Sequence, residues 1–264
     1  MRDITIGQYY PKESVIHQLD PRTKLMGTLV YIIVLFLVKN PLWYLVCLGI
    51  ILLLYRLANV PFSYFLRGLR GIAILLIFTF FFRMVCTPGK AVAEFWIFTV
   101  TQEGIHKSIC LTSRIALMIT GASLLSYTTT PRVMADGLEK SFSFLEKIKV
   151  PIRDMAVIVM IAFRFIPIMI EETNALMDAQ AARGAEFEHC SVLKKCKNVF
   201  SLLVPLFLSS VRRSSDLAMA MEARGYGGDR PSSRMYPLIY KKKDKIAYAC
   251  IVCFLLFGIV VRVL

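Results

Sequence analysis

Few residues in this chain have the types and spacing of a catalytic, redox or metal-binding site, and most of those few are better explained as packing residues. Cys250 and Cys253 have the spacing of a redox or metal-binding pair, yet they lie in an apolar segment with no second pair nearby. His189, Cys190 and Cys196 form a partial metal set in a polar stretch, where a solvated loop is the simpler interpretation. We therefore expect no catalytic residues, no metal site and no bound cofactor.

The chain also lacks the residues that an enzyme acting on nucleotides or other substrates would need. The chain has no G-x-x-x-x-G-K-[ST] sequence, which excludes ATP hydrolysis by a P-loop. The paired carboxylates Glu171 and Glu172 are neighbours on a predicted helix and point to different sides of it. An integral membrane enzyme would need a polar cluster at one depth. Only Arg83, Lys107 and Arg114 offer anything there, without a carboxylate pair.

The strongest pattern is a tripeptide of alanine, arginine and glycine that occurs twice. Its two copies, 41 positions apart, are Ala182-Arg183-Gly184 and Ala223-Arg224-Gly225. Each copy ends a helix-like run, and the glycine is placed as a helix stop. The planar guanidinium of the arginine suits carboxylate or carbonyl groups of another protein. One alternative is that each arginine caps the carbonyls of its own helix. We favour two docking points for a partner that has two similar halves.

The elements that carry these residues belong to a membrane protein. The 264 residues are 56% hydrophobic with a mean hydropathy of +0.60, above the roughly 45–50% apolar content of soluble domains. The net charge of +14 arises from 32 Lys+Arg against 18 Asp+Glu. Basic and aromatic residues do not interleave on a polar stretch, so we expect the lipid bilayer and no nucleic acid as a partner.

An all-α architecture with about five transmembrane helices follows from the apolar runs. The spans are predicted at residues 25–38, 42–55, 72–86, 108–127 and 246–264. Basic residues concentrate before the first span, in 56–71 and in 128–245, which places these parts in the cytoplasm. Three regions result. Residues 1–127 are an N-terminal membrane region of four spans, 128–245 a cytoplasmic helical region, and 246–264 a C-terminal transmembrane helix.

The cytoplasmic region is expected to contain three helices, at residues 131–147, 152–182 and about 199–223. Pro131 and Pro151 are placed to open the first two. Residues 155–170 are apolar enough to span a membrane, but Arg164 and the neighbouring charges would be costly in hydrocarbon. We favour a cytoplasmic or interfacial position, with a further span as the alternative. Apolar helix faces outside the bilayer are typical of partner-binding surfaces.

These motifs resemble a known family. Ala179-Gln180 precedes the first tripeptide and Met221-Glu222 the second, and the chain opens with SVIHQLDPRTKL at residues 14–25. Together they are similar to the transmembrane T component of energy-coupling factor (ECF) transporters. The resemblance extends from residue 14 to the last span.

The resemblance implies a non-catalytic subunit in the cell membrane of a prokaryote. T components join two ABC-type ATPase subunits, identical or homologous, to a small substrate-binding membrane protein called the S component. Carried over, Arg183 would dock in one ATPase and Arg224 in the other. The region 128–245 would be a coupling region, and the apolar faces of its three coupling helices would hold the S component. The transported substrate would be a vitamin or a transition-metal ion. The alternatives are an integral membrane enzyme and a secondary carrier without an ATPase partner.

Overall fold

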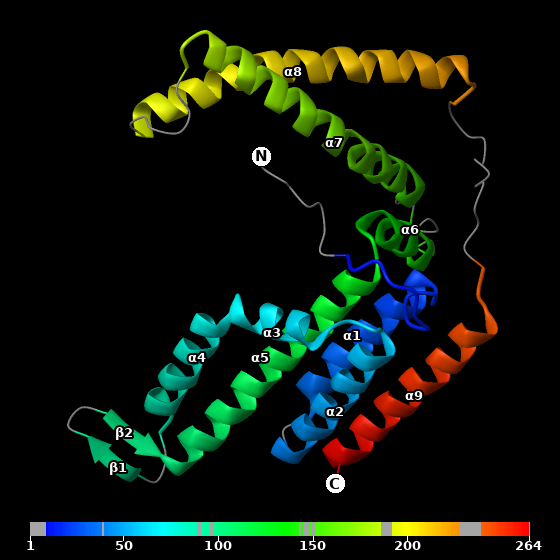
Figure 1. Cartoon of the computed structure of the whole chain (residues 1–264). Coiled ribbons are helices and arrows are strands. Elements are labelled where there is room, and N and C mark those ends of the chain that lie inside the picture. Colours follow the sequence, from blue (N-terminus) through cyan, green and yellow to red (C-terminus); the bar gives the residue numbers. More distant parts are fainter. Residues whose placement is uncertain are drawn as a thin grey trace. The chain divides into compact units, whose positions relative to one another are not determined.

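The chain is predominantly helical, as predicted, and divides into two compact units (Figure 1). The first unit comprises Met1–Ile152 with Leu238–Leu264, and the second comprises Arg153–Pro237. This computed structural model describes residues 9–38, 40–88, 91–95, 98–142, 144, 148, 151–185, 192–226 and 239–263.

The first unit is a helical bundle whose helices begin at local sequence signals. Its helices are α1 (Pro21–Leu37), α2 (Pro41–Leu57), α3 (Phe62–Arg70), α4 (Ala73–Cys86), α5 (Gln102–Thr128), α6 (Pro131–Ser141) and α9 (Lys242–Val263). Proline occupies the start of α1, α2 and α6, where its missing N–H costs no helical bond. The side chains of Asp20 and Asn40 accept from N–H groups at the starts of α1 and α2.

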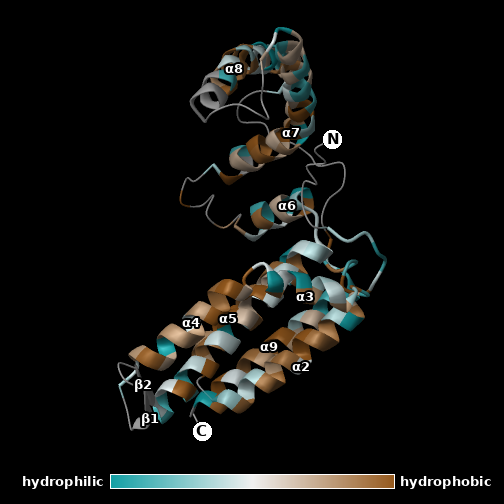
Figure 2. Cartoon of the chain, turned by 60° about the vertical axis from the view of Figure 1, so that its left-hand side comes forward, coloured by the Kyte–Doolittle hydropathy of each residue, from teal (hydrophilic) through white to brown (hydrophobic). Residues whose placement is uncertain are grey.

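Helix α1 packs against α5, α6 and α9, and α5 in turn packs against α2, α3 and α4. Glycines allow the close approach: a Cβ at Gly121 of α5 would lie 2.7 Å from Tyr31 Cε1, and one at Gly258 of α9 would lie 2.7 Å from Val34 Cγ1. The ring of Phe254 stacks on Tyr31 at 6.1 Å. The outward surfaces of α2, α4 and α9 remain strongly apolar (Figure 2).

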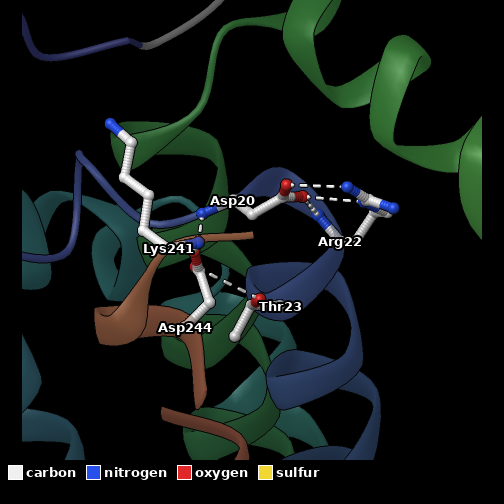
Figure 3. Close-up of polar contacts among 5 residues, drawn as sticks. All are labelled: Asp20, Arg22, Thr23, Lys241 and Asp244. Atoms are coloured by element: carbon white, nitrogen blue, oxygen red, sulfur yellow. Dashed lines mark hydrogen bonds and ion pairs between the residues drawn. The ribbon is translucent and has the colours of Figure 1, made fainter. Parts of the chain in front are cut away.

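The first and last helices are joined at their N-termini by a buried carboxylate (Figure 3). Asp244 accepts from the backbone N–H groups of Asp20 and Lys241, each at 2.8 Å, and from the Thr23 hydroxyl at 3.4 Å. Its bond to Lys241 is the reach-back bond of a capping box. Asp20 pairs in turn with Arg22 through two bonds of 3.0 Å. The start of α1 is therefore fixed by Asp244 of α9, 224 positions away.

Two of the described helices, α5 and α9, are long and apolar enough to cross a membrane. A third candidate is the pair α3 and α4. Together they are long and apolar enough to cross a membrane, but they are bent by 58° at the break between them. Helix α2 is apolar but shorter. The predicted loop at 56–71 thus contains helix α3, and the predicted span at 72–86 continues it at an angle.

One element departs from an all-helical fold. Strands β1 (Ala91–Phe95) and β2 (Phe98–Thr101) pair antiparallel between α4 and α5, with Glu94 opposite Thr99. Thr101 then caps α5, its hydroxyl accepting from the Gly104 N–H at 3.0 Å. The all-α prediction holds for the bundle, and the connection at 87–104 contains this additional hairpin.

The second unit contains two long helices, α7 (Ile152–Ala182) and α8 (Val192–Ala223). Helix α7 has the predicted bounds, whereas α8 begins about a turn or two before the predicted residue 199. Each contains an internal proline, Pro167 and Pro205. Neither is among the helices long and apolar enough, by the same criterion, to cross a membrane. The helix predicted at 131–147 corresponds to α6 of the first unit, which ends at Ser141 and packs on α1, while residues 143 and 145–147 lie outside the described residues.

Candidate functional site

Both tripeptides form the same helix-terminating structure. In the first, the N–H of Gly184 donates to Ala181 O at 2.9 Å and that of Ala185 to Gln180 O at 3.0 Å. The glycine has a φ of +87°. These bonds define a Schellman motif, in which the residue after the helix cap adopts a left-handed conformation. Arg183 is the cap residue.

The second tripeptide repeats this geometry at the end of α8. Gly225 has a φ of +73°, and its N–H donates to Glu222 O at 2.9 Å. The N–H of Tyr226 donates to Met221 O at 2.9 Å. Backbone N–H groups therefore satisfy two carbonyls near each helix end, those of Gln180 and Ala181 and those of Met221 and Glu222. The alternative in which the arginine side chains do so is not what the structure shows.

The two arginines are exposed at these ends. The alanine, arginine and glycine of both copies are all exposed to solvent. A Cβ added at Gly184 or Gly225 would meet no atom within 4 Å. The guanidinium groups of Arg183 and Arg224 make no hydrogen bond or ion pair with any residue in the described part of the chain. Each helix end thus presents a free guanidinium beside an uncovered backbone, which suits docking to another protein.

The two helices meet at a polar crossing. Arg213 of α8 lies 3.1 Å from Glu172 of α7 as an ion pair. The hydroxyl of Ser209 donates to the same carboxylate, and that of Ser210 to Met169 Sδ at 3.4 Å. Glu172 is 19% exposed and Arg213 43% exposed. From the sequence, Glu172 is recognised only as half of a carboxylate pair with Glu171, so its contact with Arg213 was missed. No local pattern in the sequence indicates this contact, because it joins residues on two different helices.

A broad apolar surface lies beside the crossing on α8. Large side chains that are exposed here include Phe200 (68%) and Phe207 (69%). On α7, Met155 and Ile158 are also exposed. Exposed large apolar side chains grouped in this way are typical of contact with another protein or with lipid.

The residues considered for other chemistry do not assemble into a site. Arg114 donates to the Tyr44 hydroxyl at 2.9 Å and to Val38 O, at the C-terminal end of α1, where positive charge is favoured. Lys107 pairs with Glu103 one turn away on α5. His189 and Cys190 lie outside the described residues, and no group of three metal-ligating side chains occurs within the described ranges.

Comparisons with known proteins point to one family. The CbiQ family model, described as cobalt transport protein, matches residues 12–236. A relative from Acidaminococcus fermentans is 42% identical over 93% of this chain and 92% of its own length. Relatives from Lactococcus lactis and Clostridium kluyveri are 38% and 40% identical over 96% and 100% of this chain, and 95% and 98% of their own lengths. All three are named energy-coupling factor transporter transmembrane protein EcfT.

Proposed function

Because the chain belongs to the CbiQ family and is similar throughout to EcfT proteins, we propose that it couples two ABC-type ATPases to an S component in an ECF importer. ATP hydrolysis takes place in the ATPases, which are identical or homologous to one another, and this chain has no catalytic role. The S component binds the substrate, a vitamin or a transition-metal ion. The complex lies in the cell membrane of a prokaryote.

The observation that carries this proposal is the matched pair of helix ends. Two helices of one unit each end in a Schellman motif, and each motif exposes one arginine without a partner in the described chain. A single such end would be an ordinary helix stop. Two identical ends fit two equivalent sites, as a pair of ATPase subunits provides. Arg183 docks in one ATPase and Arg224 in the other.

The apolar faces of α6, α7 and α8 contact the S component. This assignment is supported by the exposed large side chains on each, such as Val133 on α6, Ile158 on α7 and Phe207 on α8. Their exposure in water would be unfavourable, because each large apolar side chain gains about 1.5–3 kcal/mol on full burial. A membrane protein of small size is a partner that can cover them.

The proposed topology has five spans, formed by α1, α2, α4, α5 and α9. The N-terminus and α3 face the cytoplasm, since Arg67 and Arg70 lie on α3. We retain the division into a membrane region at 1–127, a coupling region at 128–245 and a final span at 246–264. Short α1 and α2 are accommodated by flanking polar residues at the interface.

A secondary carrier is the rival that one structural observation favours. Such carriers use broken helices near the middle of the membrane, and α3 with α4 forms a helix broken at Gly71-Ile72. However, residues 56–88 contain no Asp or Glu that could bind a coupling cation or proton. The break therefore lacks the ionisable partner that a self-sufficient carrier requires.

The docking proposal is tested by reversing both charges. The double variant Arg183→Glu, Arg224→Glu should insert in the membrane but lose co-purification of the ATPases, and each single variant should lose less. A matched control reverses one exposed arginine on each helix away from its end, Arg164→Glu with Arg212→Glu. Docking by the tripeptides is wrong if the first double variant retains both ATPases and uptake, or if the control loses them equally. Mass spectrometry of the wild-type complex identifies the partners.

A further inference from the structure

The contact between α7 and α8 lies at the same distance from the end of each helix. This equality becomes visible in the sequence only once the contact is known. Arg183 follows Glu172 by 11 positions, and Arg224 follows Arg213 by the same 11 positions. At 1.5 Å per residue, each segment from crossing to tripeptide is about 16 Å long. We call these segments, residues 172–183 and 213–224, the two arms.

The arms are suited to act as rigid levers. The internal prolines of the helices, Pro167 and Pro205, both precede the crossing, so neither arm contains a helix-breaking residue before its terminal glycine. Eleven residues make about three helical turns, so each arginine leaves its helix on nearly the same side as the ion-pair residue of that helix. The orientation of each tripeptide is thus tied to the crossing.

The contact at the crossing is directional rather than merely apolar. Glu172 is largely buried, and its carboxylate meets both Arg213 and the Ser209 hydroxyl. Small side chains, Ser209 and Ser210, let the helices approach there. An apolar contact would permit sliding, whereas an ion pair with a hydrogen bond holds one register of two helices.

We propose that the Glu172–Arg213 ion pair is the pivot of two equal arms, which fixes the separation of Arg183 and Arg224. A rotation of about 10° at the pivot would move each arm tip by about 3 Å, given the arm length. Equal arms move both tips by the same amount, so two equivalent ATPases meet equivalent ends. This use of the pivot rests on the proposed function, but the pivot itself does not. Glu172 and Arg213 are positioning residues.

The first test measures the separation of the arms without any partner. Spin labels are placed on Asp178→Cys and Met219→Cys, exposed sites five positions before each arginine, in the full chain with its native cysteines replaced and held in nanodiscs. Glu172→Gln and Arg213→Gln should each broaden the distance distribution. The charge exchange Glu172→Arg with Arg213→Glu should narrow it again.

The chain offers a matched control at the adjacent positions. Glu171→Gln and Arg212→Gln remove the same charges one residue away, where both side chains are exposed and neither has a partner in the described chain. These variants should leave the distribution unchanged. The pivot is refuted if they broaden it as much as Glu172→Gln does, or if the charge exchange stays as broad as the single variants.

The second test connects the pivot to transport. In the complete complex, Glu172→Gln should keep both ATPases bound, because the tripeptides are intact, while uptake per ATP hydrolysed falls by about fivefold, as expected for loss of one partly exposed ion pair. The charge exchange should restore coupling. If uptake by Glu172→Gln equals wild type, the pivot has no role in coupling. If the wild-type chain binds no ATPase, the proposed function fails while the distance measurement still decides the pivot.

Discussion

The substitution Gly184→Ala tests whether the backbone conformation of the helix end, and not only Arg183, contributes to the proposed docking site. Gly184 has a φ of +87°, and a Cβ placed there would meet no atom within 4 Å. The whole penalty therefore comes from the backbone, at about 1–2 kcal/mol for a non-glycine residue in the left-handed conformation. Alanine would avoid this penalty by releasing the two capping bonds, which moves Arg183. We expect ATPase affinity at this end to fall by about 5- to 30-fold.

The assay is a binding titration of purified ATPase against the chain in nanodiscs. An Arg224→Glu background weakens the second end, so that the measured affinity reports the first. Gly184→Asn is the control, since asparagine is larger than alanine but tolerates the left-handed conformation better. The ATPase affinity of Gly184→Asn should therefore fall less than that of Gly184→Ala, although the asparagine side chain is the larger. The reasoning is refuted if affinity falls in the order of side-chain volume or if alanine binds as well as glycine.

Two further changes test the packing of the first unit by thermal unfolding. Gly121→Ala places a Cβ 2.7 Å from Tyr31 Cε1 and should destabilise by about 1–3 kcal/mol, whereas Gly49→Ala meets no atom within 4 Å and should be neutral or stabilising by up to about 1 kcal/mol. Equal melting temperatures would contradict the close approach of α1 and α5. Asp244→Ala leaves two backbone N–H groups without their acceptor, one of them that of Asp20, and should cost about 1–3 kcal/mol for each. The variant Asp244→Asn keeps an acceptor oxygen. If Asp244→Ala lowers the stability no more than Asp244→Asn does, the role of Asp244 as a hydrogen-bond acceptor is contradicted.

The parts of the fold that follow from local signals were predictable. Pro131 marks the start of α6, and Gly184 and Gly225 mark the ends of α7 and α8, because each signal acts within one or two helical turns. The exposure of Arg183 beside an uncovered backbone also follows from its small neighbours.

The parts that depend on distant contacts were not predictable. The bend between α3 and α4 was missed because charges such as Arg67 and Arg70 made the segment look like a loop, although they lie on one amphipathic helix. The pairing of Glu172 with Arg213 was missed because it joins residues 41 positions apart on different helices. Hydrophobic periodicity reports which face of a helix is apolar, and it does not report which partner lies against that face.

The bond between Asp20 and Asp244 has a consequence for how the protein is made. Its two partners are separated by 224 positions, so α1 reaches the ribosome exit long before α9 exists. At about 5–20 residues per second, the delay is roughly 10–45 seconds. Throughout that time Tyr31 of α1 lacks its stacking partner Phe254, and α1 also lacks α5 until residues 102–128 have been made. The bundle of the first unit therefore receives its last helix only after α7 and α8 of the second unit have been synthesised.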